Sequence, residues 1–205
     1  MKYNNFYVFE GLDKAGKSTL INKVEQKLKE LGLEVKVIHF PTEENLKNNI
    51  FGTLVQDFLQ NNISTDKPEL IYQLYANDRL EQKEYLEWLL NKYDVVLCDR
   101  YMYSNLAYMG VKMERDMKEM VNYGFQLEYE IHQIPEPKKV FFLDTKEDIL
   151  NARYEKDKEK ADVLEKDREL QMKARLNYQS LKDLIDNYHI IYDINTKEVV
   201  KKILN

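Results

Sequence analysis

Residues 6–10 and 11–18 are FYVFE and GLDKAGKS, and these two runs decide the fold. The first run is short, apolar and rich in aromatic side chains, which predicts a buried β-strand. The second fits the pattern G-x4-G-K-[S/T], and the chain after it has the apolar spacing of an amphipathic helix. A strand, such a loop and a helix in direct succession predict a phosphate-binding loop, or P-loop. A glycine turn that only caps a helix is the alternative, and it does not require this context.

The P-loop pattern has a direct chemical meaning. Backbone N–H groups of a glycine-opened loop, together with the N-terminus of the next helix, form a concave donor site for phosphate oxygens. We expect Lys17 to neutralise the β- and γ-phosphates of ATP and the Ser18 hydroxyl to ligate Mg²⁺. The residues predicted to bind ATP within this stretch are Gly11, Asp13, Lys14, Ala15, Gly16, Lys17, Ser18 and Thr19.

Short apolar runs alternate with helix-patterned segments along all 205 residues, which predicts an α/β fold with a parallel sheet and helices on both faces. The predicted strands are Asn5–Glu10, Glu34–Phe40, Asp94–Cys98, Lys138–Leu143 and Tyr188–Ile194. The predicted helices are Ser18–Leu31, Leu46–Leu59, Glu69–Asn91, Glu114–His132, Lys146–Tyr154, Leu164–Asp186 and Lys197–Leu204. The pattern contains neither an internal repeat nor a Gly/Ser/Pro linker, so we expect residues 1–205 to form one domain.

Composition narrows the class of protein. The net charge is −5 and the pI is about 5.4, so the chain lacks the basic surplus typical of nucleic-acid binding. The single cysteine, Cys98, lies in an apolar run and rules out an intramolecular disulfide, which favours a reducing compartment. The chain contains no apolar run near the roughly 20 residues of a membrane span, and a strand follows the N-terminus at once. We therefore expect a cytoplasmic protein without a membrane or nucleic-acid partner.

A second strand ends in a carboxylate at Asp99, the type of group that Mg²⁺ or its water shell needs opposite a P-loop. Asp144 follows a similar strand, but no neighbouring residue supports a metal role there. The string NKYD at residues 91–94 resembles a guanine-reading motif of GTPases. It precedes a strand instead of following one, so it does not predict a GTPase.

Three separated segments resemble the thymidylate kinase family in order and spacing: FEGLDKAGKST at residues 9–19, YANDR at 75–79, and DRY at 99–101 followed by Ser104, Ala107 and Tyr108. The resemblance implies a P-loop NTPase fold with a five-stranded parallel sheet. It also implies ATP-dependent, Mg²⁺-dependent phosphorylation of dTMP to dTDP, and a homodimer.

The resemblance implies a role for each matching residue. Asp13 faces the sugar of the acceptor, Tyr75 stacks on thymine, and Arg79 lies one helical turn away, near the base and phosphate. Arg100 grips the acceptor phosphate with its planar, always-charged fork. The predicted acceptor-binding set is Asp13, Phe40, Tyr75, Arg79, Arg100, Ser104 and Tyr108, the catalytic set is Lys17, Lys14, Arg100 and Asp13, and the metal set is Ser18 and Asp99.

Beyond residue 143 the resemblance implies a lid, a segment that opens and closes over the bound substrates. Arg153 falls where the family has the arginine that begins the lid and packs on the ATP base. Charged residues fill most of Glu155–Asp167, and a segment with so few apolar anchors is expected to have low local stability. We therefore expect residues 154–167 to form a mobile lid, the alternative being an exposed charge run without a function.

Two departures from the family pattern leave alternatives open. Lys14 and Glu43 stand where the family has arginines, and neither a point charge nor a carboxylate replaces a guanidinium on a phosphate. A deoxynucleoside kinase, or a kinase of another pyrimidine monophosphate, is one alternative. A nucleoside kinase would need Glu10 or another strand-end acid as a base. A nucleotide-binding regulatory protein with weakened catalysis is the alternative of another class.

Overall fold

The computed structural model describes residues 2–42, 49–157, 159 and 163–205. Within them one five-stranded sheet is formed, with every strand parallel and with the order β2-β3-β1-β4-β5. The strands are β1 (Phe6–Glu10), β2 (Val35–His39), β3 (Val95–Asp99), β4 (Lys139–Leu143) and β5 (Tyr188–Ile191). The predicted fold class, an α/β P-loop architecture with a five-stranded parallel sheet, is confirmed.

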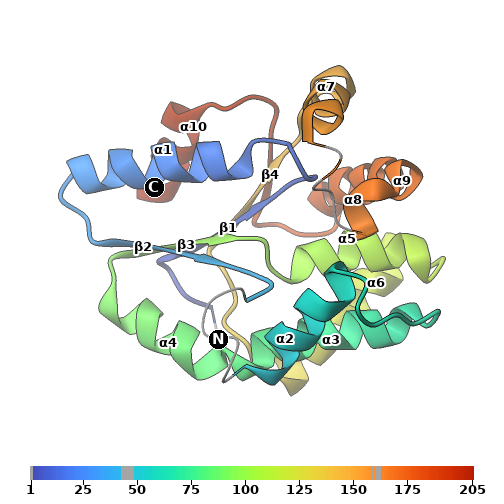
Figure 1. The fold of residues 1–205 in the computed structure, drawn as a ribbon. Coiled ribbons are helices and arrows are strands. Elements are labelled where there is room, and N and C mark those ends of the chain that lie inside the picture. Colours follow the sequence, from blue (N-terminus) through green and yellow to red (C-terminus); the bar gives the residue numbers. More distant parts are fainter. Residues whose placement is uncertain (1, 43–48, 158, 160–162) are drawn as a thin grey trace.

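Helices cover both faces of the sheet, as predicted (Figure 1). One face carries α1 (Lys17–Glu30) and α10 (Thr196–Leu204), which pack against each other. The other face carries α3 (Pro68–Glu81), α4 (Lys83–Lys92) and α5 (Met102–Lys112), with α2 (Ile50–Leu59) beside α3. The remaining helical segments are α6 (Met117–Gly124), a π-helix (Phe125–Ile131), α7 (Glu147–Asp157), α8 (Val163–Lys166), α9 (Arg168–Ser180) and a 3-10 turn (Leu181–Asp183).

Strand pairing places two loops at the same edge of the sheet. Strands β1 and β3 are buried along their whole length and pair in parallel, with Phe9 opposite Asp99. Both strands therefore end at the same level, and the chain leaves β1 as the P-loop and β3 as the turn at residues 99–101. Ligands of open α/β sheets bind at such a carboxyl edge.

Helix α5 is absent from the sequence prediction, which assigns nothing between the strand Asp94–Cys98 and the helix Glu114–His132. Eight of its eleven residues are buried: Met102, Tyr103, Asn105, Leu106, Ala107, Tyr108, Met109 and Gly110. A helix buried almost all round lacks the polar stripe on which the periodicity argument depends. The segment was missed because it lies in the core, between α3 and α9.

Two predicted long helices are each broken in the structure. The segment predicted as Glu69–Asn91 is α3 followed by α4, with Gln82 ending the first and beginning the second. The two halves pack on different partners, α3 on α5 and α4 on β3, so tertiary contacts set the break. The segment predicted as Leu164–Asp186 breaks at Asp167, whose side chain accepts a hydrogen bond from the Leu170 N–H at 2.9 Å and so begins α9.

A buried ion pair joins α3 to the π-helix (Phe125–Ile131). Arg79 donates to Glu128 through Nε (2.5 Å) and one terminal nitrogen (2.8 Å), and Tyr72 donates to the same carboxylate at 3.1 Å. Both charged side chains are almost completely buried. Burial alone would lower the pKa of Arg79, but the Glu128 charge outweighs it and raises that pKa. The Arg79 guanidinium is thus kept charged in the core by its pairing with Glu128.

We predict that Glu128→Ala lowers the free energy of unfolding by about 3–5 kcal/mol, because it leaves the Arg79 guanidinium buried without a counter-charge. The matched control is Glu30→Ala, which breaks the half-exposed Lys27–Glu30 pair (2.8 Å) on α1. Exposed pairs contribute about 0–1 kcal/mol, so the control should unfold almost as the parent does. Urea unfolding of the three proteins measures the difference, and equal midpoints would contradict the importance of the buried pair.

Candidate active site

The P-loop turns back on itself between β1 and α1. Lys14 and Gly16 both have left-handed backbone angles, with φ of 66° and 101°, and Gly16 is the N-cap of α1. A Cβ atom at Gly11 would lie 3.0 Å from the Leu143 carbonyl oxygen, so only glycine fits against the end of β4. Backbone turned in this way directs N–H groups toward a common centre, which is the arrangement that binds phosphate.

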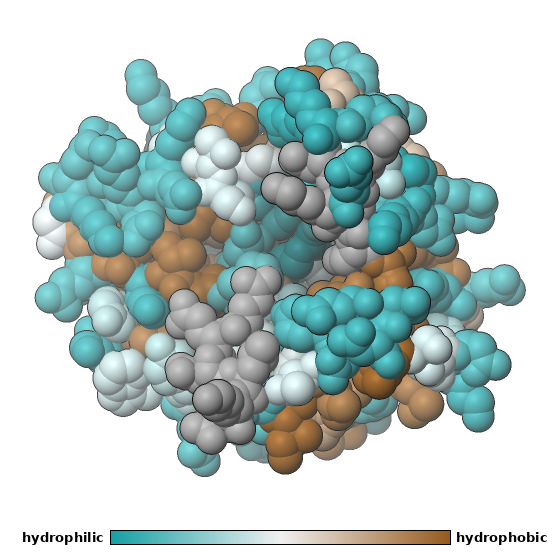
Figure 2. Space-filling view, viewed as in Figure 1, coloured by the Kyte–Doolittle hydropathy of each residue, from teal (hydrophilic) through white to brown (hydrophobic). Residues whose placement is uncertain are grey.

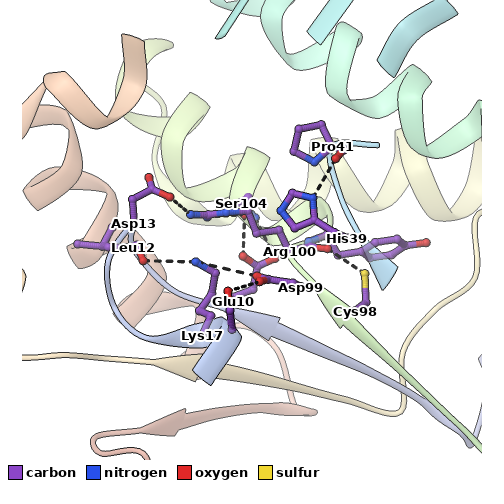
Figure 3. A network of polar contacts seen from close by, with 12 residues as sticks. Glu10, Leu12, Asp13, Lys17, His39, Pro41, Cys98, Asp99, Arg100 and Ser104 are labelled. Atoms are coloured by element: carbon purple, nitrogen blue, oxygen red, sulfur yellow. Dashed lines mark hydrogen bonds and ion pairs between the residues drawn. The ribbon is translucent and has the colours of Figure 1, made fainter. Parts of the chain in front are cut away.

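Lys17 and Asp99 meet at the mouth of this loop (Figure 3), and Ser18 lies beside Asp99. The Lys17 ammonium lies 4.0 Å from Asp99 Oδ1 and donates to the Leu12 carbonyl at 3.4 Å, and the Ser18 hydroxyl donates to Asp99 Oδ2 at 3.4 Å. Burial, and then the charge of Arg100, lower the pKa of Lys17. Asp99 Oδ1 is buried and accepts no hydrogen bond from the described residues. The two residues of the predicted metal site, Ser18 and Asp99, therefore lie together, and Asp99 Oδ1 is available as a metal ligand.

Arg100 joins the β3 turn to the P-loop. Its backbone is left-handed (φ 66°), and its N–H donates to the Phe9 carbonyl of β1 at 2.8 Å. Its guanidinium forms an ion pair with Asp13 and donates to Ser104 Oγ at 3.3 Å. Burial alone would raise the pKa of Asp13, but the charges of Arg100 and Lys17 hold that pKa below its usual range.

Asp13 also forms a hydrogen bond with a residue of α9, a contact that the sequence analysis did not predict. Gln171 donates to Asp13 Oδ2 and to the Leu164 carbonyl of α8, both at 3.1 Å, and accepts from the Tyr108 hydroxyl at 2.9 Å. Gln171 is almost fully buried. Its amide thus connects the P-loop, α5 and the end of the predicted lid. A polar side chain on the inner face of α9 was the only sequence signal, and it resembles ordinary helix packing.

A cavity of about 270 Å³ opens beside the Asp13–Arg100 pair. Figure 2 shows a polar hollow on this face, between the α7–α8 region and the α2–α3 region. All seven predicted acceptor-binding residues line the cavity: Asp13, Phe40, Tyr75, Arg79, Arg100, Ser104 and Tyr108. Unpredicted lining residues include His39, Pro41, Leu59, Tyr101, Asn105 and Met109, and two residues of the predicted lid, Leu164 and Glu165, also contribute. Segments far apart in the sequence are therefore brought to one site.

Two predicted arginines hold positions that differ from that of Arg100. Arg79 lies at the cavity wall, but its guanidinium is engaged by Glu128 in the core. Arg153 lies on the P-loop itself, where one terminal nitrogen donates to the carbonyls of Lys14 (2.8 Å) and Ala15 (2.9 Å). Arg153 thus borders the predicted nucleotide side of the site and is not among the residues that line the acceptor cavity.

Glu10 is completely buried directly behind the site. Its Oε1 accepts from the N–H groups of Tyr101 (2.8 Å) and Ser104 (3.3 Å), and its Oε2 accepts from the hydroxyls of Ser104 (2.7 Å) and Tyr178 (3.0 Å). Burial raises the pKa of Glu10, against the opposing charge of Arg100. All its acceptor positions face protein donors, and Glu10 is not among the residues that line the cavity. Glu43, one of the two departures from the family pattern, lies outside the described residues, as do residues 158 and 160–162 of the predicted lid.

A parallel α/β sheet with a P-loop at its carboxyl edge, and a carboxylate from the next strand facing it, defines the P-loop NTPase fold. The family model for thymidylate kinase matches residues 9–203. The chain is 31% identical to a probable thymidylate kinase of Pyrococcus abyssi, over 95% of this chain and 91% of that one. It is 32% identical to a thymidylate kinase of Leptospira interrogans, over 97% and 91%. The chain belongs to the thymidylate kinase family.

Solved structures agree at the level of the fold. The thymidylate kinase of Candida albicans superposes with a TM-score of 0.73 at 22% identity, covering 98% of this chain and 91% of that one. The thymidylate kinase of Ehrlichia chaffeensis gives 0.69 at 19% identity. The two likenesses show that the arrangement of strands and helices is shared.

Tyr75, half-buried in the cavity wall, is predicted to supply a ring face for the acceptor base. Stacking needs the ring and not the hydroxyl, so Tyr75→Phe should bind dTMP as the parent does. Tyr75→Ala should weaken the free energy of dTMP binding by about 1–3 kcal/mol, the typical contribution of base–aromatic stacking. Calorimetric titration with dTMP measures both variants. Equal affinity in the alanine variant would show that Tyr75 serves only in packing.

Proposed function

We propose that this protein transfers the γ-phosphoryl group of ATP to dTMP, giving ADP and dTDP, with Mg²⁺ as cofactor. Membership of the thymidylate kinase family supports the choice of acceptor. The observation that carries the proposal is the cavity lined by all seven predicted acceptor residues, which adjoins the P-loop through the Asp13–Arg100 pair. Donor and acceptor sites thus meet at one edge of the sheet.

On the donor side, the P-loop would hold the ATP phosphates, with Lys17 neutralising the β- and γ-phosphates. The leftover buried oxygen of Asp99 and the nearby Ser18 hydroxyl fit Mg²⁺, which takes oxygen ligands and usually keeps waters and substrate phosphates in its shell. When bound, the ion would neutralise charge on the nucleotide phosphates. Lys14 and Arg153 would complete the nucleotide side, Lys14 with a single point charge.

On the acceptor side, Arg100 would hold the dTMP phosphate while Asp13 accepts a hydrogen bond from the sugar 3′-hydroxyl. The Asp13–Arg100 pair keeps both groups charged and in place before the substrate arrives. Arg100 can then share its guanidinium with the incoming phosphate, since its fork carries several N–H donors. The two residues would therefore pair with each other in the empty site and contact the phosphate and the 3′-hydroxyl in the occupied one.

The transfer itself would need little help from acid–base chemistry. A phosphate oxygen of dTMP attacks the γ-phosphorus of ATP, and the bond from that phosphorus to the β–γ bridging oxygen breaks to release ADP. The attacking oxygen carries no proton at neutral pH, so positioning and charge neutralisation supply the catalysis. A nucleoside acceptor would instead need a base for its hydroxyl, and Glu10 is fully engaged by four protein donors.

We also propose that residues 1–205 act as one kinase domain, with residues 154–167 as a lid. Leu164 and Glu165 of α8 line the acceptor cavity, which is where a closing segment would contact the substrate. A homodimer, as the family resemblance implies, and a cytoplasmic location complete the proposal; the buried free thiol of Cys98 agrees with a reducing compartment. In the described residues no helix is long and apolar enough to cross a membrane.

We predict that ADP release coupled to a panel of acceptors is fastest with dTMP, compared with thymidine, dUMP, dCMP and UMP. Lys17→Ala is the matched control for P-loop chemistry. It should lower turnover by at least about 10²–10³-fold, as loss of a charge-stabilising contact in a transition state typically does. Faster phosphorylation of thymidine than of dTMP would establish the nucleoside-kinase alternative. Release of ADP with none of the acceptors would favour the regulatory-protein alternative.

A second prediction concerns Arg100. Hydrogen bonds to charged groups contribute roughly 1.5–3 kcal/mol, so Arg100→Ala should weaken dTMP binding by about tenfold or more. Affinity for an ATP analogue should change little, because Arg100 lies on the acceptor side of Asp13. Arg175→Ala provides a comparison, since it removes an arginine that pairs with Asp144 (2.6 Å) at the end of β4. Unchanged dTMP affinity in Arg100→Ala would mean that the acceptor phosphate is held elsewhere.

A further inference from the structure

Arg100 occupies a backbone conformation that is costly for a residue with a side chain, so its position needs support from its surroundings. Its φ of 66° lies in the left-handed region, which non-glycine residues rarely adopt. Its N–H donates to the Phe9 carbonyl (2.8 Å), and its own carbonyl accepts from the Cys98 thiol (2.9 Å). The next N–H in the chain, that of Tyr101, is held by Glu10 (2.8 Å). Three contacts in succession thus fix the turn.

Glu10 also reaches the guanidinium of Arg100 through one intervening side chain (Figure 3). The Ser104 hydroxyl donates to Glu10 Oε2 at 2.7 Å and accepts from an Arg100 terminal nitrogen at 3.3 Å. An ionised carboxylate only accepts hydrogen bonds, so it fixes the direction in which the Ser104 proton points. The lone pairs of Ser104 are then left for the Arg100 guanidinium and for the Tyr178 hydroxyl, which lies 2.9 Å from Ser104 Oγ. The order of donors, from Arg100 to Ser104 to Glu10, is set by the buried charge.

The same carboxylate stabilises the start of α5. Tyr101 is the N-cap of this helix and lacks a capping side chain of its own. Glu10 accepts instead from the N–H groups of Tyr101 and Ser104, at the positive end of the helix dipole. Ser104 and Tyr108, two lining residues of the cavity, are carried by this helix. One side chain from β1 therefore supports both the turn and the helix that face the acceptor.

We propose that Glu10 is a positioning residue for the acceptor-phosphate site: its carboxylate holds the Arg100 turn through the Tyr101 N–H and orients the Arg100 guanidinium through the Ser104 hydroxyl. This inference rests on the proposed role of Arg100 in binding the phosphate of dTMP. Glu10 touches neither substrate and acts through Arg100. Its influence should therefore fall on the acceptor and not on ATP.

The test is Glu10→Gln, which keeps the size of the side chain. The amide oxygen can still accept from the two N–H groups, but the NH₂ group is a donor that faces the Ser104 hydroxyl and reverses the order of donors. We expect the KM for dTMP to rise about tenfold, in line with a lost charge-assisted hydrogen bond. The KM for ATP and kcat should stay within about twofold. A fall in melting temperature without this split in KM values would show a merely structural role and overturn the proposal.

The control is Tyr178→Phe, which removes another donor to Glu10 Oε2 and a 2.9 Å contact with Ser104 Oγ, but leaves both hydrogen bonds of the link, from Arg100 to Ser104 and from Ser104 to Glu10. The Tyr178 ring stacks on Phe142 with centroids 4.7 Å apart, and phenylalanine preserves that packing. The dTMP KM of this variant should stay within about twofold of the parent, because the Ser104 link remains. A rise equal to that of Glu10→Gln would mean that any loss around Glu10 has the same effect, and would contradict the directed link.

Two double-mutant cycles make the test independent of a single variant. If Ser104 transmits the effect of Glu10, then Glu10→Gln with Ser104→Ala should raise the dTMP KM no further than either change alone. Should Glu10→Gln fail to fold, Ser104→Ala with Arg100→Ala decides, since Ser104 should have no effect once Arg100 is removed. Additive effects in the measured cycle overturn the proposal. An unchanged dTMP KM in Arg100→Ala alone would instead contradict the proposed phosphate site.

Discussion

The parallel pairing of β1 with β3 is the constraint on which the site depends. Phe9 lies opposite Asp99, so both strands end together, and the Arg100 N–H extends the pairing by one bond to the Phe9 carbonyl. Because of this register the P-loop and the turn at residues 99–101 begin side by side. A shift of one residue in this register would move every β3 side chain to the other face of the sheet. The Lys17–Asp99 and Asp13–Arg100 contacts both follow from strand order and register.

The site concentrates charge where water is scarce. Glu10, Asp13 and Asp99 supply three carboxylates against two cations, Lys17 and Arg100, a net charge of −1 when all are ionised. Nucleotide phosphates would approach a cluster that carries no positive surplus, which agrees with our proposal that a divalent cation binds beside Asp99. Arranging these charges in advance has a cost in stability. Its benefit under our proposal is that Arg100 and Lys17 need no reorganisation when the substrates bind.

Sequence reasoning succeeded where the signal was local. The P-loop is contiguous, its strand and helix flank it directly, and α1 and the five strands were predicted within a few residues. The acceptor residues came from the family resemblance, and the structure gathers all seven around one cavity. What failed were features set by tertiary contacts: α5 is buried nearly all round, and the break between α3 and α4 follows their different packing partners. Gln171 and Tyr178 were missed because the sequence does not show which distant residue a buried polar side chain on a helix will contact.

Our proposal places the acceptor phosphate against Arg100 in the cavity beside the P-loop. A crystal structure with dTMP, Mg²⁺ and a non-hydrolysable ATP analogue tests it most directly. We expect the dTMP phosphate within hydrogen-bond distance of the Arg100 guanidinium, the sugar 3′-hydroxyl beside Asp13, and the γ-phosphate of the analogue over Lys17. A dTMP molecule bound with its phosphate away from Arg100, while Arg100 remains paired with Asp13 alone, would contradict it.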